Sequence, residues 1–273
     1  MLSHWKSGEM LMKRKIMRVS SIAAAMLAIN IGLVVLFAQE AAAQSAELRV
    51  LSSDGMKPAV EALLPQIEHL VGHRLATQFD ASKRLSQKIQ SGEGFDVAIL
   101  TSNIMDDLTK QGKIAAGTRA EIARCGIGVG IRSGARKPDI STPERLKQTL
   151  LNAKSITFDH DGASAVHINK MLARLRIAED VRSKLILEQE PGRPQMNVAE
   201  GKAELVITLI PEIPAFQGVE LVGPLPADLQ SYVAFVAGIA TNTRNAEAAK
   251  AVIKFLTAPA AESTLKAKGM ELR

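Results

Sequence analysis

The sequence predicts an α/β protein with a parallel sheet covered by helices on both faces. One observation is the alternation, along residues 46–273, of short apolar runs typical of buried strands with longer segments that have helical apolar spacing. The other is composition. The chain has 273 residues, 47% hydrophobic and 23% charged, which excludes a disordered chain or a coiled coil and allows one or two domains.

The first six predicted elements alternate strictly. Residues 47–52 form a strand, and the apolar stripe over 56–70 predicts a helix in which Pro58 suits the first turn and Pro65 a kink. A strand, a helix, a strand and a helix follow at 74–79, 82–90, 95–100 and 104–111. Asn103 is expected to cap the last of these helices. This order predicts parallel strand pairing.

The next strand, at 125–132, has an unusual composition. Gly126, Gly128 and Gly130 alternate with apolar residues, so one face is glycine only, which permits a close backbone approach or a bend. Cys125 is expected to be a buried free thiol. The helices that follow are predicted at 143–151, 164–175, 195–200, 245–256 and from 259, and the strands at 155–158, 204–209 and 232–240.

The first 43 residues predict an export signal. Four cations between residues 13 and 18 precede an apolar run at 22–37 and then Ala41-Ala42-Ala43, a small-residue cleavage pattern. The run is shorter than the roughly 20 residues that span a bilayer comfortably. We therefore expect a signal peptide at 1–43 and a soluble, periplasmic mature protein. An uncleaved N-terminal anchor is the alternative.

Composition excludes several functions. The net charge is +6, of which +3 falls in residues 1–43, so the mature chain lacks the clustered basic face of a nucleic-acid binder. A single cysteine excludes an intrachain disulfide and a Cys-rich zinc site. His69 and His73 have the spacing of a metal pair, but no third ligand follows. We expect no metal and no cofactor.

Several segments together resemble a known family. They are SSDGMKP at 52–58, FDASKRL at 79–85, GFDVAI at 94–99, and FLTAPAAE at 255–262 followed by Gly269-Met270. In this order they are similar to the periplasmic substrate-binding proteins of ABC importers, in the molybdate-binding branch. The resemblance covers most of residues 46–273.

The resemblance implies the two-lobed type II periplasmic binding protein fold. Each lobe would be a mixed or parallel sheet flanked by helices, with two crossing strands as a hinge and the ligand between the lobes. Lobe 1 would comprise 46–125 plus 236–273, and lobe 2 would comprise 126–235. The strands at 126–130 and 232–240 fall where the crossings belong.

Three predicted strand ends run into helices, and ligands of open parallel sheets bind at such ends. Ser53 and Gly55, Ser82, and Ser164 offer hydroxyls or backbone N–H groups there. These donors predict a small anionic ligand. The alternative is that the serines only cap helices.

The sequence departs from the molybdate pattern implied by the resemblance. The resemblance implies three side-chain donors for molybdate, namely a serine in the first loop, a serine in the second loop and a tyrosine in the last strand–helix turn. In this sequence Gly55 replaces the first serine and Ser82 matches the second. The tyrosine position falls at or near Leu209, beside Thr208. In exchange the chain offers cations near these loops, namely Lys83, Arg84 and Arg193. Because Arg binds carboxylates well, an organic carboxylate competes with molybdate as the ligand. Solvated surface positions are the alternative for Lys83 and Arg84.

Three functions remain open. The first is a monomeric solute-binding protein that presents its anion to ABC importer membrane subunits. The second is an isomerase of a small unsaturated polycarboxylate, as some proteins resembling this family are, with His160, His167, Lys83 or Asp54 as the base. The third is a binding subunit for a membrane sensor.

Overall fold

The computed structural model describes residues 47–272, so the predicted signal peptide at 1–43 lies outside the described residues. Helices and strands alternate over this range, and the strands form one mixed sheet in the order β2-β1-β3-β9-β4-β7-β5-β6, with β8 paired to β4. The strands are β1 Leu48–Ser53, β2 Leu75–Asp80, β3 Val97–Thr101, β4 Ala120–Arg132, β5 Ile156–Asp159, β6 Leu185–Glu188, β7 Leu205–Leu209, β8 Val219–Pro224 and β9 Tyr232–Ile239.

The sheet divides into two groups of parallel strands. β1 pairs in parallel with β2 and β3, and β5 pairs in parallel with β6 and β7. Between the groups, β9 is antiparallel to β3 and β4, and β4 is antiparallel to β7 and β8. This is the two-lobed α/β architecture that the sequence predicts, with β1–β3 in the first lobe and β5–β8 in the second.

Helices cover both lobes. The first lobe has α2 Lys57–Val71, α3 Ser82–Gln90, α4 Ser102–Lys110, α9 Ala246–Leu256 and α10 Pro259–Ala267, and the second has α5 Pro143–Asn152, α6 Ala165–Arg174, α7 Ala178–Val181 and α8 Arg193–Ala199. α2 continues through Pro65 and ends at Gly72, which has a φ of 67°. The capping prediction for Asn103 is wrong, because α4 begins at Ser102, directly after Thr101 at the end of β3.

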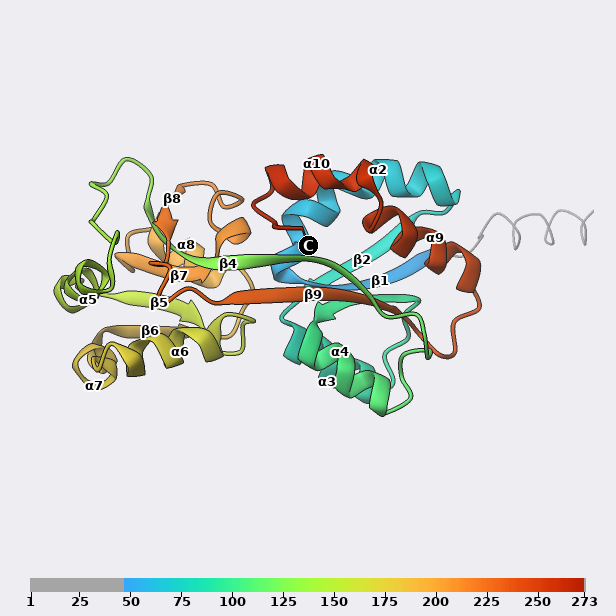
Figure 1. The fold of residues 1–273 in the computed structure, drawn as a ribbon, viewed down its shortest axis with the longest axis horizontal. Helices are drawn as coiled ribbons and strands as arrows, with labels where there is room; N and C mark the ends of the chain where they lie inside the picture. The colour runs from blue at the N-terminus through green and yellow to red at the C-terminus, as the bar shows by residue number, and fades with distance from the viewer. Residues whose placement is uncertain (1–46, 273) are drawn as a thin grey trace, which may run out of the picture. The chain divides into compact units, whose positions relative to one another are not determined.

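β4 runs from the first lobe into the second. It pairs with β9 over Ala120 to Gly126 and with β7 and β8 beyond that point, and it runs beside β9 from one group of elements to the other (Figure 1). Where β4 changes partners, the side-chain amide of Gln230 accepts from the Ile127 N–H at 2.8 Å and donates to the Ile127 carbonyl at 2.9 Å. A side chain thus completes the hydrogen bonding of the crossing strand.

The glycine face of β4 permits close packing, as predicted. A β-carbon at Gly128 would lie 2.9 Å from Leu221 Cδ1, and one at Gly130 would lie 2.8 Å from Val206 Cγ1. Larger residues at these positions would displace β7 or β8. The sequence analysis did not identify β6, β8, α7 or the first five residues of β4.

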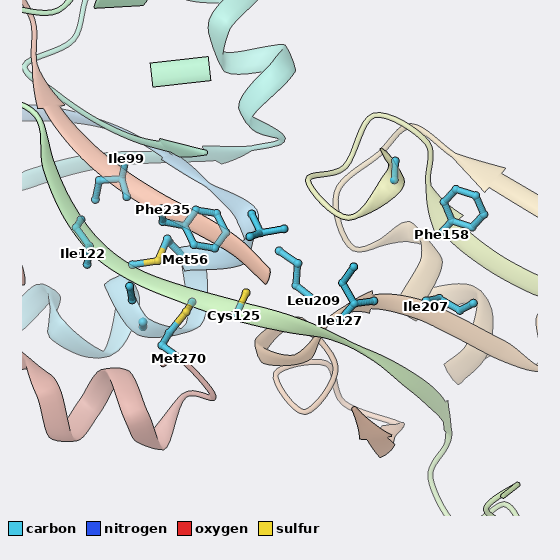
Figure 2. Packing of buried hydrophobic residues seen from close by; sticks show 14 of the residues in the cluster. Met56, Ile99, Ile122, Cys125, Ile127, Phe158, Ile207, Leu209, Phe235 and Met270 are labelled. Carbon is cyan, nitrogen blue, oxygen red and sulfur yellow. The ribbon is translucent and has the colours of Figure 1, made fainter. Parts of the chain in front are cut away.

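The main apolar core extends along β4 into both lobes. Cys125 is fully buried and free, as predicted, and Figure 2 shows its side chain on β4 in the same cluster as Met56, Phe235 and Leu209. Burial raises the pKa of this thiol well above its ordinary value. The thiol is therefore protonated and unreactive near neutral pH.

Candidate functional site

A cavity of about 370 Å³ lies between the strand ends of the two lobes. Ser53 at the end of β1 and Ala81 after β2 line it from the first lobe, and Asp159 at the end of β5 and Thr208 in β7 line it from the second. Ligands of parallel α/β sheets bind beyond the carboxyl ends of the strands. The cavity therefore lies where the fold places a ligand.

Three buried polar side chains face this cavity without hydrogen-bond partners among residues 47–272. Ser53, Ser164 and Gln195 are 1%, 3% and 5% exposed, and all three line the cavity. Of the polar atoms of these three side chains, Gln195 Oε1 is the one that is fully buried while it accepts no hydrogen bond from any described residue. Buried polar atoms normally have partners, and leaving this one unpaired costs about 1–3 kcal/mol. A bound ligand would supply the missing partners.

The predicted hydroxyl and glycine positions divide into two groups. Ser53, Ser164 and Thr208 line the cavity, whereas Gly55 and Ser82 are not among its lining residues. The Ser82 hydroxyl accepts a hydrogen bond from the Thr101 backbone N–H at 3.1 Å, so it joins α3 to β3.

The three predicted cations, Lys83, Arg84 and Arg193, are not among the lining residues, and each contacts another side chain of the protein. Arg84 donates to Asp80 Oδ1 at 2.5 Å and to Asp159 Oδ2 at 2.9 Å, and so connects the two lobes. Lys83 pairs with Asp161 at 2.5 Å.

Arg193, the third predicted cation, has its Nη1 atom 3.1 Å from the sulfur of Met196. Lys57, at the start of α2, is instead the cation in the lining. Its place in the first helical turn after β1 was the sequence signal that could have identified it.

Carboxyl groups form much of the cavity wall, and the sequence analysis missed most of them. Asp54, Asp159 and Glu212 line it together with Glu61. Burial raises the pKa of Asp54 to about 7, and the negative charges of Asp80 and Asp159 add to the shift. Burial also raises the pKa of Glu212 to about 8, although the Thr208 hydroxyl donates a hydrogen bond to its carboxyl group.

The predicted histidines lie outside the cavity lining. His160 Nδ1 is 3.1 Å from the Glu188 carbonyl oxygen, and His167 is half-buried on α6, where burial lowers its pKa. In the described part of the chain, no group of three or more His, Cys, Asp or Glu side chains could hold a metal ion. Within residues 47–272, no helix has both the length and the apolar character that crossing a membrane requires.

The chain is similar to both binding proteins and an enzyme. It is 27% identical over 231 residues to an aconitate isomerase from Pseudomonas sp., covering 82% of this chain and 87% of that protein. It is 26% identical over 244 residues to the molybdate-binding protein ModA of Azotobacter vinelandii, covering 85% of this chain and 92% of that protein.

Solved structures show the same fold. The periplasmic molybdate-binding protein of Azotobacter vinelandii superposes with a TM-score of 0.71 at 18% identity, over 83% of this chain and all of that chain. A family model described as bacterial extracellular solute-binding protein matches residues 48–271. By this match over most of its length, the chain belongs to the family of bacterial extracellular solute-binding proteins.

Proposed function

We propose that this protein captures a small anion in the cavity between its lobes and presents it to the membrane subunits of an ABC importer. The observation that carries the proposal is the group of unpartnered polar side chains, Ser53, Ser164 and Gln195, around a cavity at the strand ends. Lys57 adds a positive charge to the wall. The molybdate-binding relative supports an anion as the ligand class.

Within this class, a small organic carboxylate is favoured over molybdate. The resemblance implies three molybdate donors, and hydrocarbon packs at two of these positions, because Leu209, at or near the tyrosine position, and Phe235 occupy the space beside Gly55. The third, Ser82, is hydrogen-bonded to the Thr101 N–H and is not among the lining residues. The remaining polar wall combines hydroxyls, an amide, a lysine and the carboxyl groups of Asp54, Glu61, Asp159 and Glu212. Its hydroxyl, amide and lysine donors come from both lobes, which suits an elongated anion with several acceptor oxygens.

Calorimetric titration with molybdate, sulfate, citrate, cis-aconitate and trans-aconitate tests this proposal. Ser53→Ala, Ser164→Ala and Gln195→Ala should each weaken binding of the same probe about tenfold, because each removes one hydrogen bond to a charged group. Ser86→Ala is the matched control, since Ser86 is buried in α3 and is not among the lining residues. Binding of no probe by correctly folded protein would refute anion capture.

One observation favours a second function, the isomerisation of a small unsaturated polycarboxylate. Asp54 lines the cavity, no described residue is hydrogen-bonded to its carboxyl group, and its pKa is about 7, which suits a general base. Its carboxylate would take a proton from one carbon of an allylic system and return it to another, with no net gain or loss of atoms. The aconitate isomerase relative supports this alternative.

Proton NMR separates the two functions. Purified protein incubated with cis-aconitate in deuterated water would form the trans isomer and incorporate deuterium only if it is an isomerase. Asp54→Asn should then abolish turnover while binding persists. If the protein binds cis-aconitate but leaves it unchanged over many hours, isomerisation is excluded for this substrate and the solute-binding function stands.

We also infer that residues 1–43 direct export and that the mature chain acts as a periplasmic monomer. The basic and apolar segments before Ala43 support export. In this proposal lobe 1 is formed by 46–125 plus 236–273 and lobe 2 by 126–235, and they close on the ligand. Mass spectrometry of exported protein should find a start near Gln44, and small-angle scattering should show a smaller radius of gyration with ligand.

A further inference from the structure

The charge of the cavity wall conflicts with simple anion capture. Four carboxyl groups, those of Asp54, Glu61, Asp159 and Glu212, line the cavity, and Lys57 is the cation in that lining. If all of these groups were ionised, the negative charges would outnumber the positive one and would repel an anion. Anion capture therefore requires that some of these carboxyl groups be neutral.

Two of the four carboxyl groups have cationic partners. Asp159 is bonded to Arg84 at 2.9 Å, and Glu61 lies 3.9 Å from the amine of Lys57. Asp54 and Glu212 form no ion pair with any residue between 47 and 272. Both residues are partly buried. Withdrawing a carboxylate from water without a cation beside it is costly, and such a position favours the protonated form.

The two unpaired carboxyl groups lie on neighbouring turns. Asp54 begins η1 (Asp54–Met56), which follows β1, and Glu212 ends η3 (Ile210–Glu212), which follows β7. The two turns pack against each other. Asp54 thus follows Ser53 directly in the first lobe, and Glu212 accepts a hydrogen bond from the Thr208 hydroxyl within the second lobe.

We propose that Asp54 and Glu212 bind the ligand as carboxylic acids, each donating its O–H to an oxygen of the anion, so that the protein captures a polycarboxylate together with protons. This inference rests on the proposed function. A neutral acid is a hydrogen-bond donor, whereas an ionised one only accepts. Two acids beside the Ser53 and Ser164 hydroxyls give a wall of donors that matches the many acceptor oxygens of a di- or tricarboxylate.

The charged surroundings of both acids support this assignment. The charged groups that act on Asp54 are Lys57, Asp80, Arg84 and Asp159, and the groups near Glu212 are Asp54, Asp159, Thr208 and the Cys125 thiol. Burial outweighs the cations Arg84 and Lys57 at Asp54, whose pKa is raised to about 7. At Glu212 burial outweighs the hydrogen bonds from the Thr208 hydroxyl and the Leu209 backbone, and the pKa is raised to about 8. A bound anion would raise both pKa values further.

Calorimetry between pH 6 and pH 9 tests the proposal, with citrate and cis-aconitate as probes. Titrations in buffers that differ in ionisation enthalpy count the protons taken up with the ligand. We expect net proton uptake at pH 8, and a Kd that rises about tenfold per pH unit for each coupled proton above the pKa. Affinity is therefore highest on the acid side and is lost as the pH rises through 7 to 8.

Amide variants provide the decisive comparison. Asp54→Asn and Glu212→Gln stay neutral and keep an N–H donor at every pH, so each should reduce proton uptake, flatten the pH dependence and bind at pH 9 at least as tightly as the wild type. Glu247→Gln is the control, because Glu247 forms an exposed pair with Lys250 on α9 and is not among the lining residues, so its loss should leave the slope unchanged. The titration of the probe itself is the same for every variant and cancels.

The outcomes distinguish this inference from the proposed function. Tight anion binding by the wild type without proton uptake, or an unchanged slope in both amide variants, would overturn the protonated-acid assignment and leave anion capture standing. Binding of no probe anion at any pH, or capture of an organic cation such as putrescine that tightens as the pH rises, would overturn both. If one amide variant does not fold by circular dichroism, wild-type proton uptake and the other variant decide.

Discussion

Leu209 occupies the space that a side chain at position 55 would need. A β-carbon at Gly55 would lie 2.5 Å from Leu209 Cδ1 and 2.6 Å from Phe235 Cζ. Both of these side chains belong to the apolar core (Figure 2). By resemblance, Gly55 and Leu209 are the two places where a molybdate binder has a serine and a tyrosine. The two departures therefore form one packed unit and not two independent changes.

This contact predicts the effect of restoring the serine. Gly55→Ser should lower the free energy of unfolding by about 1–3 kcal/mol, because the new side chain collides with Leu209 and Phe235. Urea denaturation measures it. The control is Gly223→Ser, whose β-carbon would lie 3.7 Å from its nearest neighbour, Ile140. Equal stability of the two variants would contradict the packing, and adding Leu209→Ala to Gly55→Ser should recover part of the loss.

The Gln195 amide should raise the affinity for the anion and lower the stability of the ligand-free protein. Gln195→Leu removes a buried amide that has no protein partner, so the ligand-free protein should lose no stability or gain about 1 kcal/mol, while anion affinity falls about tenfold. Thermal melts and calorimetry measure the two effects. Asn197→Leu on the same helix is the contrasting variant. Asn197 donates a hydrogen bond to Glu188 at 2.6 Å, so its replacement should destabilise the folded protein. Destabilisation by both variants alike would argue that Gln195 serves the fold.

Arg84 should stabilise the protein more than its neighbour Lys83. Arg84→Met leaves Asp80 and Asp159 without this partner and should cost about 1–3 kcal/mol at pH 7. Lys83→Met breaks an exposed pair with Asp161 and should cost under about 1 kcal/mol. Denaturant titrations at several pH values compare them.

The cost of Arg84→Met should also depend on pH. Although burial opposes it, hydrogen bonds from Arg84 and Lys88 hold the pKa of Asp80 below its ordinary value. The stabilisation by this pair is therefore present above about pH 4 and is lost as the pH falls through the folded-state pKa. The difference between Arg84→Met and the wild type should shrink in acid. A difference that grows below pH 4 would contradict the pairing.

The ligand-free protein should be less stable in mild base than in mild acid. Asp54 and Glu212 have folded-state pKa values of about 7 and about 8, above the values near 4 of an unfolded chain. The folded state therefore holds more protons, and stability declines as the pH rises from about 4 through 8. Thermal melts at pH 6 and pH 9 should show this decline, and Glu212→Gln should reduce it. A wild type that melts higher at pH 9 would contradict the prediction.

The sequence predicted the elements that carry regular apolar patterns, and it placed Ser53 correctly at the end of β1 and Ser164 correctly before the helix α6. The ligand role of these serines remains a prediction. Two lining residues were not identified as site residues. Glu212 ends a three-residue turn, which has no periodicity to mark it. Gln195 lies in a helix that the sequence predicts at 195–200, but a helix of seven residues does not show from sequence which side chain faces a cavity.

Pairing over long distances could not be predicted either. Arg84 and Asp159 are 75 residues apart, and their bond depends on how two lobes meet. No local pattern indicates whether a helix-surface arginine will find a carboxylate on another lobe or a ligand in the cavity. The same limit applies to Lys83 and Asp161, which are 78 residues apart.

The Gln230 amide stands in for a strand partner at Ile127. The Ile127 carbonyl accepts from the Gln230 amide at 2.9 Å and from the Leu225 backbone N–H at 3.0 Å, whereas the Ile127 N–H has the Gln230 side-chain oxygen as its acceptor at 2.8 Å. Gln230→Leu would therefore leave the carbonyl one partner and the N–H none among the described residues. A backbone group left unpaired in this way costs about 1–3 kcal/mol, so the integrity of the crossing strand depends on one side-chain oxygen.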